Sequence, residues 1–207
     1  MKSLCIYCGA SSGASPAYAQ AARAMAGAMV ERGISLVYGG GRVGLMGVIA
    51  DEVMRLGGRA TGVIPRALMD REVGHTGLTE LHVVKDMHER KALMAELADD
   101  FVALPGGIGT LEELFEVFTW SQLGMHDKPV ALLNAAGYYD GLIAFLEHAV
   151  RERFLSSEHA AVLMYEPEPT PLLERLRAFT PPTGVRTYER EQARQLIQGD
   201  VRASPCP

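Results

Sequence analysis

The sequence has few cysteines, no long apolar run and no excess of basic residues, and each shortage excludes a class of protein. Its three cysteines, Cys5, Cys8 and Cys206, are an odd number among 207 residues and fit no disulfide framework. No stretch approaches the roughly 18 uninterrupted apolar residues of a membrane helix, and the apolar run after Lys2 is too short for a secretory signal. We therefore expect a cytoplasmic protein that makes no membrane contact.

Charges of the two signs are nearly balanced. Lys and Arg number 20 and Asp and Glu number 25, so the formal net charge is −5. Binding of a nucleic acid needs a clustered basic face, so we expect no nucleic-acid partner. A few local donors can still hold a small anionic ligand. Hydrophobic residues make up 48% of the chain, and the length suits one domain with a sizeable core.

The signatures of several common enzymes are also missing. No Gly-x-Ser-x-Gly elbow supplies a hydrolase nucleophile, and no glycine cluster ends in the Gly-Lys-Ser/Thr of a Walker A loop. The segment 88–92 begins like the zinc motif HExxH but has alanine in place of the second histidine. Cys5 and Cys8 have the spacing of a redox pair, but they lie in an apolar run typical of a strand, whereas a redox pair opens a helix. The sequence thus indicates neither a metal site nor a redox cofactor.

Short apolar runs alternate with longer amphipathic stretches, which predicts an α/β fold with a Rossmann-like, doubly wound parallel sheet in a single domain. The predicted strands occupy residues 4–7, 35–38, 59–64, 81–84, 101–104, 130–133 and 161–164. We place the domain at residues 1–180 and expect 181–207 to be a partly disordered C-terminal extension. In such folds ligands bind at the carboxyl ends of the strands, near a topological switch point.

Helix boundaries are marked by local signals. The first helix has Ser15 as its predicted N-cap, Pro16 at its first position and Gly33 just past its end. Two later helices open with the capping-box pattern, at residues 86–89 and 110–113.

Three of the loops that follow strands are rich in glycine. They cover residues 8–13 (CGASSG), 39–47 (GGGRVGLMG) and 105–113 (PGGIGTLEE). The first has small residues and two hydroxyls, which suit a ligand but also occur in ordinary tight turns. The third places a glycine cluster directly before a predicted helix, the arrangement that holds a phosphate on backbone N–H groups.

The second loop matches G-x-G-x-x-G at positions 39, 41 and 44. A dinucleotide site would also need an acidic residue at the end of the next strand to hold the ribose hydroxyls. That strand ends in Ile64, Pro65 and Arg66, none of which is acidic. The sequence therefore lacks the acidic residue that a nicotinamide-cofactor site requires. A phosphate on glycine N–H groups needs no such acid and stays open.

Arg90 is a candidate functional residue because it shares a helix face with apolar side chains. It lies three and four residues before Leu93 and Met94, and an inward arginine usually pairs with a carboxylate or a phosphate. The alternative is a side chain that snorkels at the edge of the core. Lys91 lies about 100° further round the helix and could be solvated.

Glu113 is the second candidate. It shares a helix face with Val117 and Trp120, and that face is apolar enough to line a pocket or a subunit contact. The alternative is that Glu113 completes a capping box with Thr110 and has only a structural role. The spacing alone does not separate these two interpretations.

The chain resembles the LOG ("Lonely Guy") family at three segments, 105–113, 87–91 (MHERK) and 39–47. This family comprises cytokinin riboside 5′-monophosphate phosphoribohydrolases, many of them long mislabelled as lysine decarboxylases. Further matching stretches are 8–13 and 119–124 (TWSQLG), and the similarity covers about residues 3–180.

The resemblance implies hydrolysis of the N-glycosidic bond of AMP-type nucleotides, either AMP or N6-prenylated AMP, which releases the base and ribose 5-phosphate and activates cytokinins. It implies Arg90 and Glu113 as the catalytic pair, a homodimer, and no cofactor or metal. The implied substrate-binding residues are Ser12, Gly40, Gly41, Glu72, Lys91, Gly106, Gly107, Ile108, Gly109, Thr110, Leu111, Glu112 and Thr119.

The implied chemistry agrees with the residue types. Cleavage of such a bond develops positive charge on the ribose, and a nearby carboxylate such as that of Glu113 stabilises this charge and orients the attacking water. Arg90 would position the carboxylate or the nucleotide. The alternative is a non-catalytic protein that binds or carries a nucleotide or molybdenum cofactor, although a mere binder has no need of this pair. A decarboxylase has little support, because no context marks a lysine as a Schiff base to pyridoxal phosphate.

Overall fold

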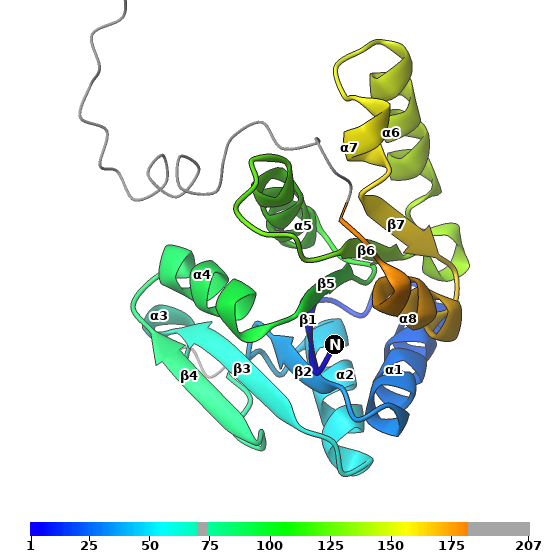
Figure 1. Ribbon diagram of the computed structural model, residues 1–207. Coiled ribbons are helices and arrows are strands. Elements are labelled where there is room, and N and C mark those ends of the chain that lie inside the picture. The colour runs from blue at the N-terminus through cyan, green and yellow to red at the C-terminus, as the bar shows by residue number, and fades with distance from the viewer. Residues whose placement is uncertain (70–73, 182–207) are drawn as a thin grey trace, which may run out of the picture.

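The computed structural model describes residues 1–69 and 74–181, which form one parallel sheet with helices on both faces. The strands are β1 (Ser3–Tyr7), β2 (Ser35–Tyr38), β3 (Ala60–Pro65), β4 (Glu80–Val84), β5 (Asp100–Ala103), β6 (Val130–Leu133) and β7 (Leu163–Glu166). Their order is β4-β3-β2-β1-β5-β6-β7, and each neighbouring pair is parallel (Figure 1). The chain builds from β1 toward one edge and then resumes on the other side of β1, which makes β1 and β5 the switch point. The predicted Rossmann-like, doubly wound sheet is confirmed.

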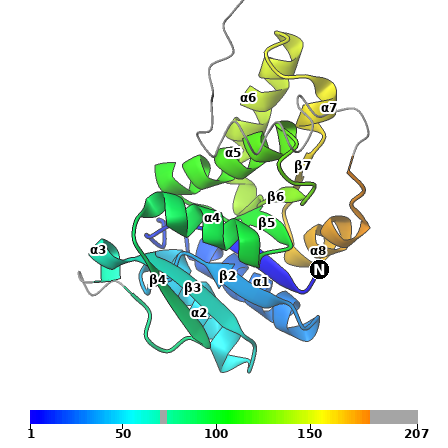
Figure 2. The same cartoon turned by 60° about the vertical axis from the view of Figure 1, so that its left-hand side comes forward.

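Two helical layers cover the sheet. The helices are α1 (Pro16–Glu31), α2 (Gly44–Arg55), α3 (Arg66–Met69), α4 (Met87–Leu97), α5 (Ile108–Gln122), the 3-10 turn η1 (Ala135–Gly137), α6 (Asp140–Arg151), α7 (Ser157–Ala160) and α8 (Pro169–Ala178). One apolar core joins α1, α2 and α8 to one face of the sheet, and a second core joins α4, α5 and α6 to the other (Figures 1 and 2).

The signals at the ends of α1 act as predicted. The Ser15 hydroxyl accepts a hydrogen bond from the Ala17 N–H at 3.2 Å, and Pro16 occupies the first helical position. Gly33 follows the helix with φ +67°, a conformation that glycine adopts without strain. The bounds of α1 are therefore set by the capping residues at its two ends.

Two predicted boundaries are wrong by two residues or more. The last strand runs over Leu163–Glu166 rather than 161–164, because Ala161 still bonds to Ser157 and closes the turn after α7. α5 begins at Ile108 with Gly107 as its N-cap, so Thr110 lies inside the first turn and no capping box forms there. In both places backbone hydrogen bonding set the boundary, and side-chain polarity did not reveal it.

The predicted domain boundary at residue 180 lies at the edge of the described part of the chain. Beyond Pro181 the C-terminal extension lies outside the described residues. In residues 1–69 and 74–181, no helix combines the length and the apolar character required to cross a membrane.

Cys5 and Cys8 are free and buried. Burial raises the pKa of each thiol far above its ordinary value. Both thiols therefore stay protonated at neutral pH and are unreactive.

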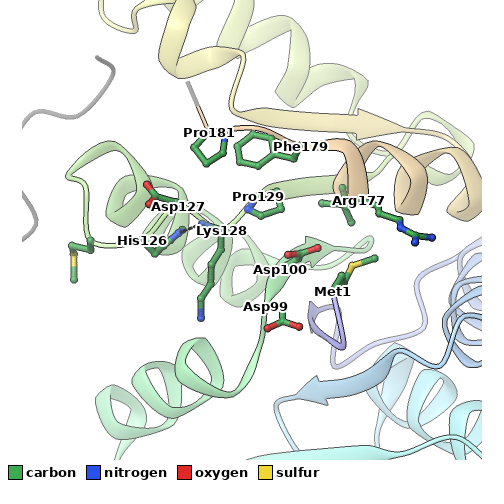
Figure 3. Close-up of a pocket in the computed structure, with 12 residues that line it drawn as sticks. Met1, Asp99, Asp100, His126, Asp127, Lys128, Pro129, Arg177, Phe179 and Pro181 are labelled. Carbon is green, nitrogen blue, oxygen red and sulfur yellow. Dashed lines mark hydrogen bonds between the residues drawn. The ribbon is translucent and has the colours of Figure 1, made fainter. Parts of the chain in front are cut away.

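A cavity of about 490 Å³ opens at the amino-terminal ends of the strands, where it is lined by Met1, Asp100 and Pro129 among others (Figure 3). Asp100 lines it and is only 6% exposed. Burial raises the pKa of Asp100 from an ordinary value of 3.8 to about 6, while the N-terminal ammonium and Lys128 oppose the rise and Asp99 adds to it. The charged form of Asp100 thus carries a folding cost at neutral pH.

We expect Asp100→Asn to stabilise the protein above pH 6 and to leave its stability unchanged near pH 4. The folded carboxyl holds its proton more tightly than the unfolded one, so its contribution to stability is lost as pH rises from about 4 to about 6. The gain at pH 7.5 is about 2 kcal/mol, or roughly 5 °C in the thermal midpoint. Thermal unfolding of both proteins across pH 4–8 measures it.

Asp99→Asn is the matched control. The Asp99 carboxylate accepts hydrogen bonds from the Lys2 N–H at 2.5 Å and the Ser3 N–H at 3.1 Å. Although burial opposes the effect, these bonds lower the pKa of Asp99. Its replacement should therefore destabilise the protein at neutral pH. A gain for Asp100→Asn that does not vary with pH would show that ionisation is not its cause.

Candidate active site

The switch point brings the three glycine-rich loops together. Gly9, after β1, donates its N–H to the carbonyl of Pro105, after β5, at 3.1 Å. Leu45, in the first turn of α2, donates its N–H to the carbonyl of Gly9 at 2.9 Å. Gly44 permits this approach, since it has φ +59° and a Cβ there would overlap the backbone of Ala10. These hydrogen bonds hold all three loops at the carboxyl edge of the sheet.

A cavity of about 450 Å³ lies between the first and third loops. It is lined by Gly9, Ala10, Ser11, Ser12, Gly13, Tyr18, Leu45, Pro105, Gly106, Gly107 and Tyr138. Gly107 is the N-cap of α5, so the free N–H groups of the first helical turn and the positive end of the helix dipole lie at this cavity. The arrangement suits a phosphate or another small anion.

Arg90 reaches the site from the first turn of α4. Asp86 caps this helix as predicted, accepting hydrogen bonds from the N–H groups of His88 and Glu89 at 3.0 Å each. Glu89 in turn accepts from the N–H of Lys85 at 2.7 Å. The cap sets where α4 starts and therefore which way Arg90 points, which is inward toward the sheet.

Arg90 and Glu113 form an ion pair, with 2.8 Å between Nη1 and Oε1 and side chains 11% and 10% exposed. The Arg90 Nε also donates to the Val63 carbonyl at 3.2 Å. Arg90 is therefore buried and paired rather than snorkelling. Because α5 has no capping box, the carboxylate of Glu113 is available for Arg90. Burial raises the pKa of Glu113, and the Arg90 guanidinium opposes that rise.

Gly39, directly after β2, leaves room for this pair. A Cβ at position 39 would overlap the Nη2 atom of Arg90. The second glycine loop thus contributes to the site through the absence of a side chain. Its next residues, Gly40 and Gly41, contact the segment that begins at residue 74: the His75 N–H donates to the Gly40 carbonyl at 2.8 Å, and Gly41 forms a β-bridge with Gly74.

Lys91 is not solvated as the sequence analysis allowed. It is 9% exposed, and its ammonium donates to Glu112 at 2.6 Å and to Glu116 at 2.9 Å. Burial acts to lower the pKa of Lys91, but its hydrogen bonds to the two glutamates prevail and raise it. Lys91 therefore ties α4 to α5 beside the Arg90–Glu113 pair.

The remaining residues implied by the resemblance are spread along α5 and its approach. Thr110 is buried, whereas Ile108 is 82% exposed and Leu111 packs partly against the core. A Cβ added at Gly109 would meet no atom within 4 Å. Thr119 lies eleven residues beyond Ile108, about 16 Å along the helix, and does not line the cavity. Glu72 lies outside the described residues.

Tyr138 and Tyr18 also line the cavity, although no sequence motif marked them as site residues. Tyr138 follows β6, and its hydroxyl donates to the Gly106 carbonyl at 2.5 Å. Its position in a loop at the carboxyl edge of the sheet was a usable signal. Its neighbours carry no glycine cluster, so no motif drew attention to it.

The fold and the site define a Rossmann-like α/β protein with a buried arginine–glutamate pair and a glycine-walled cavity at the start of α5, although neither charged side chain lines that cavity. Among the described residues, no group of three or more His, Cys, Asp or Glu side chains is placed to hold a metal ion. A family model described as "Possible lysine decarboxylase" matches residues 46–176. A probable cytokinin riboside 5′-monophosphate phosphoribohydrolase of Oryza sativa subsp. japonica, LOGL6, is 49% identical over 178 residues, covering 86% of this chain and 71% of the relative.

A second relative, the cytokinin riboside 5′-monophosphate phosphoribohydrolase LOG7 of Arabidopsis thaliana, is 49% identical over 180 residues, covering 87% of this chain and 83% of the relative. The chain belongs to the LOG family.

Solved structures with the same fold include the molybdenum cofactor binding protein of Rippkaea orientalis. Its TM-score is 0.65 at 19% identity, over 86% of this chain and 97% of that one. The molybdenum cofactor carrier protein of Chlamydomonas reinhardtii has a TM-score of 0.64 at 17% identity, over 86% and 98% of the two chains. At these identities the likeness establishes the fold alone.

Proposed function

We propose that this protein hydrolyses the N-glycosidic bond of AMP-type nucleoside 5′-monophosphates, releasing the free base and ribose 5-phosphate. The observation that carries the proposal is the buried Arg90–Glu113 ion pair, whose Glu113 lies on α5, the helix that begins at the glycine-walled cavity. The names of the relatives at 49% identity support the same activity. No step of it needs a metal or a redox cofactor.

The reaction places distinct demands on the two ends of the substrate. The phosphate is held by the N–H groups at the start of α5, in the cavity that Ser12 also lines. The ribose lies toward Glu113, whose carboxylate stabilises the positive charge that develops at C1′. Water bonds to C1′, the C1′–N bond breaks with its electron pair on the base, and the proton from water ends on the base.

Arg90 has two effects on Glu113. Its guanidinium opposes the rise in the pKa of Glu113 that burial causes, which favours the ionised carboxylate. The pair and the Val63 carbonyl also hold both side chains in one geometry. A carboxylate positioned in advance needs little reorganisation when charge develops on the ribose.

The test is to incubate the protein with AMP and with N6-isopentenyl-AMP and to separate the products by chromatography. Adenine or N6-isopentenyladenine should appear together with an equal amount of ribose 5-phosphate. Adenosine, which lacks the phosphate, is the control and should be a much poorer substrate. Tight binding of nucleotide with no free base from either monophosphate would favour a non-catalytic carrier.

The proposal includes a homodimer in the cytoplasm. The free thiols of Cys5 and Cys8 are consistent with a reducing compartment. Exposed aromatic residues on and after α6 support the dimer: Phe145 is 62% exposed and Phe154 is 90% exposed. Leu142, Ile143 and Leu146 of α6 pack partly against the core, whereas Phe145 of the same helix is left exposed. A second copy of the chain would cover Phe145 and Phe154.

We expect Phe145→Asp to convert the dimer to a monomer. Loss of one buried aromatic side chain and the burial of a charge together weaken an interface by several kcal/mol. Light scattering during size-exclusion chromatography measures the mass. Leu56→Asp, at an exposed apolar position after α2, is the control and should stay dimeric. A monomeric wild-type protein would contradict the dimer without touching the proposed chemistry.

A further inference from the structure

The loop between β6 and α6 is strained and firmly held. Ala136 has φ +52°, which is uncommon for a residue with a side chain, and Gly137 has φ +70°. The Asn134 side chain closes the loop with two hydrogen bonds to the residues that follow it. Its Oδ1 accepts a hydrogen bond from the Tyr139 N–H at 2.7 Å, and its Nδ2 donates to Asp140 Oδ1 at 2.7 Å. Strain kept in place by several hydrogen bonds suggests that the position of this loop matters.

The loop sets Tyr138 against the third glycine loop. The Tyr138 hydroxyl donates to the Gly106 carbonyl at 2.5 Å. Its ring packs edge-on against Tyr18, with 5.4 Å between centroids, and against Tyr139, with 4.9 Å. Tyr138 is 42% exposed and lines the cavity, so core packing does not explain why its hydroxyl points at a glycine carbonyl.

The hydrogen bond controls a peptide that would otherwise turn easily. The Gly106–Gly107 peptide has no side chain on either side, so it lacks the steric barriers that fix other peptides. A peptide group is planar and trans, so holding the Gly106 carbonyl also fixes the direction of the Gly107 N–H. Gly107 is the N-cap of α5. The phenol therefore sets the orientation of the backbone at the start of the proposed phosphate site.

We propose that Tyr138 is a positioning residue for phosphate binding: through its hydrogen bond to Gly106 it holds the N-terminus of α5 in the orientation that binds the substrate phosphate. This inference rests on the proposed function, because it assigns the phosphate of a nucleoside monophosphate to that helix end. Tyr138 acts through Gly106 and takes no part in breaking the glycosidic bond.

Tyr138→Phe tests the inference, because it removes only the hydroxyl and keeps the ring contacts with Tyr18 and Tyr139. We expect KM for AMP to rise roughly fivefold to tenfold, the loss expected for one hydrogen bond, with kcat changed less than twofold. The inhibition constant of ribose 5-phosphate should rise in parallel, whereas that of adenine should not change. Tyr165→Phe, at a tyrosine 43% exposed on β7, is the matched control and should behave as wild type.

The outcomes separate the inference from the proposed function. If wild type hydrolyses AMP and Tyr138→Phe has unchanged KM and an unchanged inhibition constant for ribose 5-phosphate, the inference is wrong and the function stands. An equal loss of affinity for adenine and ribose 5-phosphate would also overturn it, since that is general disorder of the site. If wild type hydrolyses nothing, calorimetric titration with AMP still decides: weaker binding by Tyr138→Phe supports the positioning role, and equal binding refutes it.

Discussion

Replacing Glu113 by Gln should lower kcat for AMP about 10²- to 10³-fold while nucleotide binding persists. Gln has the same shape and can still accept a hydrogen bond from Arg90, but it carries no negative charge to stabilise the developing charge at C1′. The binding groups at the start of α5 are untouched. Release of adenine measures the turnover, and calorimetric titration with AMP measures the binding.

Glu174→Gln is the matched control, since Glu174 is exposed on α8, on the other face of the sheet. Its turnover should equal that of wild type. Equal turnover by Glu113→Gln and wild type would remove this carboxylate from the mechanism.

The pH profile gives a second measurement on the same variant. Burial raises the pKa of Glu113 above the ordinary 4.5, and activity requires the ionised form. kcat/KM of wild type should therefore fall as pH decreases through a value above 4.5. In Glu113→Gln this decrease in kcat/KM at low pH should be absent from the residual activity. If the decrease persists in the variant, the titration of another group causes it.

Gly39→Ala should cost about 100-fold in kcat/KM although the substitution lies in a loop and changes no charge. The new methyl group would overlap the guanidinium of Arg90, which must move and take its partner Glu113 with it. A displacement of about 1 Å at a catalytic group is enough for a loss of this size. The overlap should also destabilise the fold by about 1–3 kcal/mol. Steady-state kinetics and thermal unfolding measure the two effects.

Gly27→Ala is the control for adding a methyl group. A Cβ at Gly27, within α1, meets nothing within 4 Å. This variant should keep wild-type activity and gain up to about 1 kcal/mol, because alanine favours a helix more than glycine does. Full activity in Gly39→Ala would mean that the position of Arg90 is unimportant for the reaction.

Local signals predicted part of the fold and of the site well. β2 and β6 have the predicted bounds, and α1 and α4 begin at the predicted caps. These features depend on residues close together in sequence, such as Asp86 and the N–H groups two and three positions later. Alternation of strands and helices also predicted the sheet, because each apolar run needs burial on both faces.

The two errors at the site share one cause. Thr110 and Glu113 have the spacing of a capping box, yet Gly107 caps the helix and Glu113 pairs with a residue of another helix. Lys91 sits at a position that a helical wheel leaves near solvent, yet two glutamates of α5 surround its ammonium. A pattern within one helix cannot show what the neighbouring helix presents.

By itself, the sequence determined the parallel α/β architecture, the three glycine loops and the two charged candidate residues, Arg90 and Glu113. The spacing of apolar residues, the residue types at turns and the helix caps all act over a few residues, so they can be recognised in the sequence. Tertiary structure alone decided that Arg90 faces Glu113, that Gly39 makes room for them and that Tyr138 holds Gly106. Each of these contacts joins segments more than twenty residues apart. These contacts form only in the assembled sheet, because parallel neighbours such as β5 and β6, which Gly106 and Tyr138 follow, bring their following loops to one edge.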